Sequence, residues 1–190
     1  MDMQASRQLA VTQQQAWDAL NDPEVLKACI PGCEKIESTG PDSFTASVTV
    51  KIGPVSAKFG GKVKLSDLNP PASYTLGFEG QGGAAGFGKG TAQVSLTPNA
   101  GGCQLDYTVH AQVGGKLAQI GQRLVDGAAR SMAEDFFKRF DDEMQRRHPA
   151  AAAAEAAPAP AAEAPRGPAI PAWAWIGGVL VLAALWWLTR

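Results

Sequence analysis

Hydrophobic and polar residues alternate along the chain from Cys33 to Val113, and glycine or proline interrupts the alternation at intervals. In residues 44–52 every second position is apolar, from Phe44 to Ile52, and the positions between them are Thr, Ser or Lys. A period of two is typical of a β-strand with one buried face. The same period recurs in four further stretches, 55–65, 74–79, 88–97 and 103–113. We therefore expect six successive antiparallel strands, the first of which begins at Cys33.

The segment before these strands combines a short strand with two helices. Residues 3–11 alternate loosely, which indicates an edge strand. Thr12 and Gln15 have the spacing of a capping box, so a helix is expected from Thr12 to about Leu20. Asp22-Pro23 places a capping residue before a proline, which predicts a second short helix that ends near Ala28.

After Gly114-Gly115 the hydrophobic period becomes helical, and one helix of about 30 residues is expected from Lys116 to Arg147. We predict that the axis of its buried face runs through Leu117, Ile120, Leu124, Ala128, Ser131, Asp135 and Arg139, and that Gly121, Val125, Met132, Phe136 and Phe140 lie beside this axis on the same face. A curved antiparallel sheet wrapped around one long helix is the helix-grip arrangement of the α+β class. It leaves a cleft between sheet and helix, and the two short helices are expected to close one end of it.

The C-terminal part of the chain differs in composition. Residues 149–169 are rich in Ala and Pro, which is typical of a linker. Residues 170–188 contain no charge, and at 1.5 Å per residue they extend roughly 28 Å, close to the ~30 Å hydrocarbon core of a bilayer. Tryptophans bracket this stretch, as in membrane-interface belts, at positions Trp173, Trp175, Trp186 and Trp187. We predict a helix-grip domain over 1–148 and a single transmembrane helix over 170–188, the alternative being a buried core helix.

The two ends of the chain predict its location. Residues 1–4 show neither the basic region nor the apolar run of a secretory signal. An anchor at the extreme C-terminus inserts only after translation ends. We therefore expect a single-pass protein of the cytoplasmic (inner) membrane whose folded domain faces the cytoplasm.

Charge and metal-binding residue types exclude some functions. The chain has 17 Lys and Arg against 18 Asp and Glu, so a nucleic-acid partner is not suggested. Three cysteines, Cys29, Cys33 and Cys103, argue against a disulfide framework. His110 and His148 are the only histidines, and Cys29 and Cys33 have no second pair to complete a zinc site. No metal site and no covalent cofactor are expected.

Three segments resemble the CoxG family of carbon monoxide dehydrogenase proteins, within the START-like (SRPBCC) helix-grip superfamily. They are the Cys29-Ile30-Pro31-Gly32-Cys33-Glu34 turn with the Asp22-Pro23 helix start before it, the Lys51-Ile52-Gly53-Pro54 turn, and Gly114 to Gly121. The resemblance covers about residues 1–145. It implies an accessory protein that places a molybdenum hydroxylase of the carbon monoxide dehydrogenase type at the membrane. It also implies an apolar cavity for a quinone-like or other lipophilic molecule.

The residues themselves point to candidates for such a cavity. Large inward-facing or rim side chains are expected to line it: Phe44, Phe59, Tyr74, Phe78, Phe87, Tyr107, Leu117, Ile120 and Leu124. Small inward residues would leave it underfilled, namely Ala46, Ala57, Gly61, Ala92, Ala111, Gly121 and Ala128. The alternative for each of these positions is ordinary core packing. The glycine-rich run 80–90 lacks the sequence of a phosphate loop, so we interpret it as a flexible rim on which Phe87 swings or as a bulged hairpin.

A basic stripe is expected on the outer face of the sheet, formed by Lys51, Lys58, Lys62 and Lys64. It is either a docking surface for an acidic partner or anionic lipid headgroups, or an ordinary solvated face. No nucleophile with its base can be assembled. Tyr107 and His110 point to opposite faces by parity, and Asp135 with Arg139 is expected to form a simple pair on the helix.

These observations favour a membrane-anchored accessory protein, not an enzyme, with three partners: the lipid bilayer, a molybdenum hydroxylase and a bound quinone or similar lipid. The alternatives are a structural adaptor without a ligand, a lipid-binding helix-grip protein with another partner, and an enzyme acting on a lipophilic substrate. The last would need a polar group in the cavity with a perturbed pKa, for which Asp135 is the first candidate.

Overall fold

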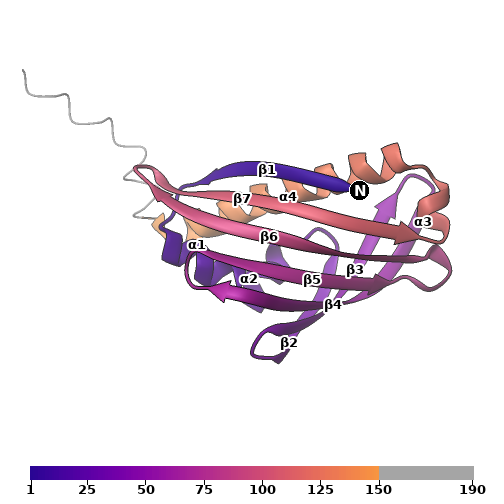
Figure 1. The fold of residues 1–190 in the computed structure, drawn as a ribbon, viewed down its shortest axis with the longest axis horizontal. Helices are drawn as coiled ribbons and strands as arrows, with labels where there is room; N and C mark the ends of the chain where they lie inside the picture. The colour runs from indigo at the N-terminus through magenta and orange to yellow at the C-terminus, as the bar shows by residue number, and fades with distance from the viewer. Residues whose placement is uncertain (150–190) are drawn as a thin grey trace, which may run out of the picture. The chain divides into compact units, whose positions relative to one another are not determined.

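A computed structural model describes residues 1–149 and shows one seven-stranded antiparallel sheet with helices on one face (Figure 1). The strands lie in the order β1-β7-β6-β5-β4-β3-β2, so the chain meanders from β2 to β7 and β1 closes the row at the β7 edge. The strands are β1 (Asp2–Leu9), β2 (Cys33–Gly40), β3 (Ser43–Ile52), β4 (Val55–Asn69), β5 (Ser73–Gln81), β6 (Phe87–Asn99) and β7 (Gly102–Gly114). The six expected strands after the helices and the expected edge strand are confirmed.

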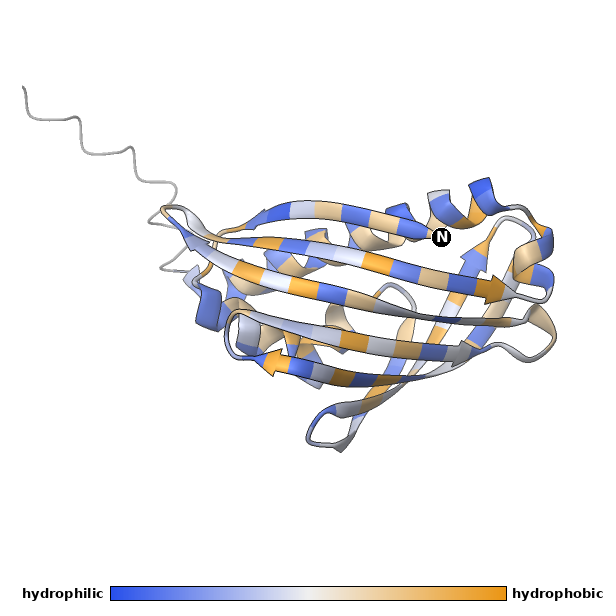
Figure 2. Cartoon of the chain, viewed as in Figure 1, coloured by the Kyte–Doolittle hydropathy of each residue, from blue (hydrophilic) through white to orange (hydrophobic). Residues whose placement is uncertain are grey.

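The register carries the period-two pattern across the whole sheet. Phe44 pairs with Val63, Val63 with Phe78, and Phe78 with Gly90, so one cross-strand row keeps its side chains on the inner face. Figure 2 shows the result as bands of apolar and polar residues along the strands. Only one sheet face is therefore apolar, and the helices cover that face.

The two short helices begin where their capping residues predict. In α1 (Gln13–Leu20) the Thr12 hydroxyl accepts a hydrogen bond from the Gln15 amide, and the Gln15 side chain accepts one from the Thr12 amide. In α2 (Pro23–Cys29) the Asp22 carboxylate accepts from the Glu24 amide at 2.9 Å. Both expected helices are confirmed, and α2 packs against α4 and against β2.

The C-terminal helix is divided, which corrects the expectation of one continuous helix from Lys116. A single turn, α3 (Lys116–Gln119), is followed by Ile120 and Gly121, and then by α4 (Gln122–Arg147). Gly121 has φ +96°, a backbone conformation that breaks the helix and that glycine adopts without a steric penalty. The short 3₁₀ turn η1 (Gly83–Ala85) lies against α3 between β5 and β6.

The axis of the buried face of α4 differs from the expected one, although Val125 and Phe140, expected beside that axis, are buried. Its buried residues are Val125, Phe137, Phe140, Glu143 and Met144, whereas Leu124 is 54% exposed and Ser131, Asp135 and Arg139 lie in solvent. The expected axis passes through Leu117 and Ile120 and holds only for a helix that continues unbroken from Lys116. Because the chain turns at Gly121, the phase is reset there and the true face lies about one residue further along.

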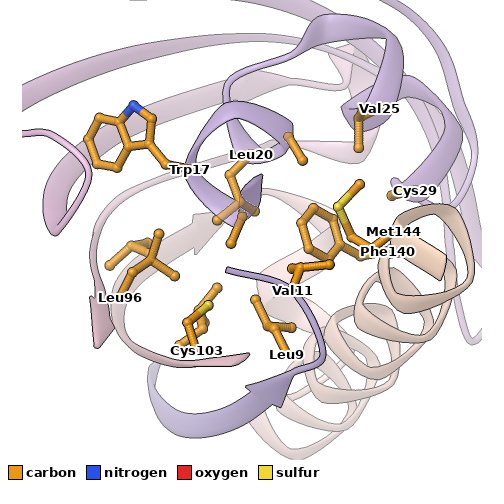
Figure 3. Packing of buried hydrophobic residues seen from close by; sticks show 14 of the residues in the cluster. Leu9, Val11, Trp17, Leu20, Val25, Cys29, Leu96, Cys103, Phe140 and Met144 are labelled. Atoms are coloured by element: carbon orange, nitrogen blue, oxygen red, sulfur yellow. The ribbon is translucent and has the colours of Figure 1, made fainter. Parts of the chain in front are cut away.

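The densest part of the core lies at the end of the sheet that α1 and α2 close (Figure 3). Phe140, Leu9 and Leu105 are among its fully buried side chains. Two cysteines, Cys29 and Cys103, are enclosed with them as free thiols. Side chains therefore fill the space among these residues.

Within residues 1–149 no helix is long and apolar enough to cross a membrane. The expected linker (149–169) lies outside the described residues apart from Pro149. The expected transmembrane helix (170–188), with Trp173, Trp175, Trp186 and Trp187, lies entirely outside them.

Candidate ligand cavity

An apolar cavity of about 270 Å³ lies between the inner face of the sheet, the two short helices and α4. Helices α1 and α2 contribute Leu20, Leu26 and Ile30 to its wall, and α4 contributes Phe136 and Phe137. The strands supply the rest: Ile36, Phe44, Val63, Leu65, Tyr74, Leu76, Ala92, Val94, Leu105 and Tyr107. The cavity therefore lies next to the dense core.

The register explains why space remains here. Leu65 pairs with Leu76 and Leu76 with Ala92, so a row of inward leucines on β4 and β5 ends at a methyl group on β6. Ala92 is buried and lines the cavity. Of the seven small inward residues that were expected to leave space, it is the one that lines this cavity. One small side chain on a central strand thus helps to leave the sheet underfilled at this point.

The cavity wall carries no charged side chain, and its only polar atoms in side chains are the hydroxyls of Tyr74 and Tyr107. Tyr74 is 6% exposed, and its ring meets the edge of Trp17 at a centroid distance of 5.4 Å. Tyr107 is half-buried and stacks on Phe137 at 5.5 Å. Burial raises the pKa of both hydroxyls, so both are protonated hydrogen-bond donors at neutral pH.

Three of the nine candidate cavity residues are brought together in this wall, namely Phe44, Tyr74 and Tyr107. The other six lie elsewhere. Leu117 is buried in α3, Ile120 is half-buried at the helix break, and Leu124 is exposed on α4. The remaining three are phenylalanines of the sheet.

These three phenylalanines lie against glycines. The rings of Phe59 and Phe87 occupy the space that a Cβ would take at Gly82, which follows β5, and at Gly114 on β7. At Gly90 on β6 an added Cβ would meet the His110 carbonyl oxygen first and then the ring of Phe78. An aromatic ring laid over a strand glycine is a known way to stabilise a sheet that lacks a side chain there. Phe87 is 39% exposed and pairs across the sheet with Gly114. The glycine-rich run therefore packs against rings, and Phe87 does not line the cavity.

The candidate docking lysines do not all share one environment. Lys58 forms an ion pair with Glu34 on β2, and Lys51 is exposed near the β3–β4 turn. Lys62 and Lys64 lie at a broad open depression of about 1250 Å³ on the outer face of the sheet. Glu79 and Lys89 continue the row from Lys62, because Lys62 pairs with Glu79 and Glu79 with Lys89. This surface therefore carries charges of both signs.

The titratable residues considered as catalytic candidates, His110, Asp135 and Arg139, do not meet one another in residues 1–149. His110 forms a 2.6 Å contact with Asp2 on the outer face, on the opposite side of β7 from Tyr107. Asp135 and Arg139 are both exposed on α4, away from the cavity. No cluster of three or more potential metal ligands occurs among residues 1–149.

Several wall residues were not among the sequence candidates. Val63, Leu65, Leu76, Val94 and Leu105 have the inward parity of their strands, so the pattern could have found them. Leu26 and Ile30 could not be found this way, because their place depends on how α2 docks on the sheet. Phe136 and Phe137 depend on the phase of α4 after the break at Gly121.

A family model described as CoxG of carbon monoxide dehydrogenase matches residues 6–145, which is most of the chain. The chain belongs to the CoxG family. A crystal structure of a conserved protein from Geobacillus kaustophilus is similar as well, with 37% sequence identity and a TM-score of 0.73. That similarity covers 77% of this chain and 96% of the Geobacillus chain.

More distant structures share only the fold. A protein from Mycobacterium smegmatis is 16% identical with a TM-score of 0.59, covering 77% of this chain and 92% of its own. A protein from Chromobacterium violaceum is 12% identical with a TM-score of 0.58, covering 74% of this chain and 95% of its own. No curated protein matches the chain. Membership in the CoxG family implies an accessory protein of carbon monoxide dehydrogenase rather than a catalytic component.

Proposed function

We propose that this CoxG-family protein holds a molybdenum hydroxylase of the carbon monoxide dehydrogenase type at the cytoplasmic membrane and keeps a quinone-like lipophilic ligand in its apolar cavity. The observation that carries the ligand half is a cavity of about 270 Å³ whose lining side chains are all apolar or tyrosine. The family match supports the partner half. The uncharged stretch 170–188 supports the membrane half.

The size of the cavity suits part of a lipid rather than a whole one. A closed apolar cavity of about 150 Å³ is enough to bind benzene, and drug-sized ligands occupy roughly 300–1,000 Å³. A space of about 270 Å³ therefore holds a ring system of one or two rings. A long isoprenoid or acyl tail would have to extend out of it, toward solvent or the bilayer.

Membrane attachment would serve both halves of this function. A flexible linker keeps a domain near its anchor at high effective concentration. A lipophilic ligand then moves only a short distance between the bilayer and the cavity. The partner enzyme meets the ligand at the same surface.

The recruitment half is tested by deleting residues 166–190 and fractionating cells that also make the partner enzyme. We expect the enzyme to move from the membrane to the soluble fraction. A control chain, in which residues 170–188 are replaced by an unrelated apolar segment of equal length, should keep the enzyme at the membrane. Unchanged partitioning after the deletion would refute recruitment by this tail.

The ligand half is tested by purifying the full-length chain, extracting it with organic solvent and identifying the extract by mass spectrometry. We expect a quinone or related lipid in a fixed ratio to protein, above the amount in protein-free micelles. If nothing is extracted and added quinones also fail to bind, the protein is a structural adaptor. Recruitment would then stand without the carrier function.

A further inference from the structure

The side chain of Tyr74 is largely enclosed, and its hydroxyl has no hydrogen-bond partner among the described residues. Every fully shielded side-chain nitrogen or oxygen in that part of the chain has a partner, so the Tyr74 oxygen must keep some accessible surface. The side chain is 6% exposed and lines the cavity. A hydroxyl that meets no protein acceptor but keeps some accessible surface is satisfied by water or by a bound molecule.

The position of the Tyr74 ring is fixed. Trp17 packs its edge against the ring at an interplanar angle of 83°. Tyr74 also lies in the same cross-strand row as Tyr107, with Val94 of β6 between them. The two backbones are thus about 10 Å apart, two strand spacings. The hydroxyl is consequently held in place before any ligand arrives.

The surroundings of this hydroxyl restrict the ligand. An ionised group that enters a wall of aliphatic and aromatic side chains loses its hydration without gaining a counter-charge. A neutral acceptor oxygen loses less and gains the hydrogen bond from tyrosine. A pure hydrocarbon would leave the hydroxyl unsatisfied, which carries a penalty of its own.

We propose that the cavity selects a neutral, ring-bearing lipophile with a carbonyl oxygen, and that the Tyr74 hydroxyl donates the hydrogen bond that orients this oxygen. This inference rests on the proposed ligand-holding function and adds its specificity residue. Tyr107 is half-buried and has the charged groups Arg7, Arg130 and Glu134 near it, so its hydroxyl is less isolated from water. A hydrogen bond at Tyr74 therefore discriminates between ligands more strongly than one at Tyr107.

The test uses three ring compounds of similar size. They are a dimethyl-naphthoquinone with both reactive ring carbons methylated, the dimethylnaphthalene of the same shape, and naphthoate as the anion. Each is equilibrated by dialysis with the full-length chain in detergent micelles, and protein-free micelles give the blank. The chains compared are the wild type, Tyr74→Phe and Tyr107→Phe.

We expect the wild type to prefer the naphthoquinone over the hydrocarbon and to bind naphthoate most weakly. Tyr74→Phe should weaken naphthoquinone binding by about 3- to 10-fold, the range for one lost hydrogen bond, and leave the hydrocarbon unchanged. Tyr107→Phe should change naphthoquinone binding by less than about 2-fold, because its hydroxyl is closer to water. The thermal midpoint of Tyr74→Phe should match the wild type, since the hydroxyl has no protein partner to lose.

The other outcomes separate this inference from the function on which it rests. Equal binding of naphthoquinone and hydrocarbon, unaffected by Tyr74→Phe, overturns the role of Tyr74 but leaves a lipophile-binding cavity. Tight binding of naphthoate overturns the selection for a neutral ligand. A loss of binding in Tyr107→Phe alone overturns the assignment of the orienting bond to Tyr74. Failure of every probe to exceed the blank overturns the ligand-holding function itself.

Discussion

Cys29 and Cys103 are enclosed by apolar neighbours, whereas Cys33 is half-buried at the start of β2. Burial raises the pKa of the Cys29 thiol to about 11, with the Glu143 carboxylate adding to the effect. Burial likewise raises the pKa of Cys103, and it raises that of Cys33 although a hydrogen bond with the Lys35 backbone opposes part of the effect. Because the thiolate is the reactive form, all three cysteines should be slow nucleophiles. Their rates should differ according to how easily a reagent reaches each thiol.

Alkylation of the native protein should therefore reach Cys33 first. With iodoacetamide at about pH 8, we expect Cys29 and Cys103 to react at least ~10-fold more slowly than Cys33, because their thiols are both protonated and shielded. Peptide mass spectrometry over a time course measures the three rates. In denaturant all three rates should become similar, and similar rates in the native protein would contradict the burial described here.

Single residues were predictable where their role is local. Thr12, Gln15 and Asp22 act within one helical turn, so the sequence alone located both helix starts. Leu26 and Ile30 act through the docking of α2, which no local pattern encodes. The same holds for the hydroxyl of Tyr74, whose parity was predictable but whose lack of a partner depends on the whole wall.

At the scale of elements, two glycines with positive φ connect consecutive elements, and they differ in the space around them. Gly32, between α2 and β2, has φ +73° and lies against Thr49, where an added Cβ would meet the Thr49 carbonyl oxygen. Gly121, between α3 and α4, has φ +96° and open space around the position of a Cβ. A side chain at position 32 would therefore cause both backbone strain and a steric clash, whereas a side chain at position 121 would cause backbone strain alone.

Alanine at these two positions should separate the two costs. We expect Gly121→Ala to lower the free energy of unfolding by about 1–2 kcal/mol, the cost of a left-handed conformation for a non-glycine residue. Gly32→Ala should cost more, because β3 or the turn must also move. Urea denaturation of both variants measures the difference in the free energy of unfolding. An equal loss in the two variants would mean that the turn at Gly32 moves aside at no cost.

Helix α2 is clamped to the end of α4 by charged groups. Arg147 donates to Asp22 at 2.9 Å and to Glu143 at 2.6 Å, and Asp22 in turn caps α2. The bonds from Arg147 and then Arg146 lower the pKa of Glu143. A carboxylate with a lowered pKa stabilises the fold above its ordinary value of 4.5 and loses that contribution as the pH falls through its folded-state pKa.

Removal of the clamp should loosen the α2 wall of the cavity. We expect Arg147→Met to lower stability by about 1 kcal/mol near neutral pH, a modest value because the pair is partly exposed and screened. Amide hydrogen exchange in residues 23–29 should accelerate. Arg146→Met is the matched control, since Arg146 also binds Glu143 but has no bond to α2. If both variants change exchange in α2 equally, the Asp22 bond is not what holds this helix.

The hydrophobic period predicts the strands and helices well wherever it continues without interruption. It fails after Gly121, where the break in the helix shifts which residues face the sheet. The strands, their order of meander and the two short helices followed from alternation and caps. The division of the last helix at Gly121 did not, because a helix tolerates an isolated glycine at a cost of only about 1 kcal/mol, so the glycine alone does not predict a break. The phase error after Gly121 then moved Leu124 and Asp135 to the wrong face.

At the scale of the whole molecule, the expected cleft between sheet and helix is present as a cavity toward the end closed by α1 and α2. Its position depends on the summed volumes of side chains from nine elements, which the hydrophobic pattern along the sequence does not give. The size of the side chain at position 92 affects the volume of the cavity, because Ala92 is buried on β6 and lines the space. Filling the cavity from this position should separate ligand binding from recruitment.

We expect Ala92→Leu to abolish ligand binding without loss of the fold. The larger side chain enters open space, so the added buried area offsets the strain that overpacking would cause in a filled core. The free energy of unfolding should stay equal or rise, and extraction should yield no lipid. Gln93→Leu is the control, since Gln93 is the next residue on β6 but lies on the outer face of the sheet.

The same pair of variants tests whether the two proposed activities are independent. If the tail alone recruits the enzyme, Ala92→Leu should keep the enzyme at the membrane while the purified chain carries no lipid. Membrane fractionation and lipid extraction from the same cells give both readings. Release of the enzyme by Ala92→Leu but not by Gln93→Leu would mean that the occupied cavity shapes the docking surface. Recruitment would then depend on the ligand instead of preceding it.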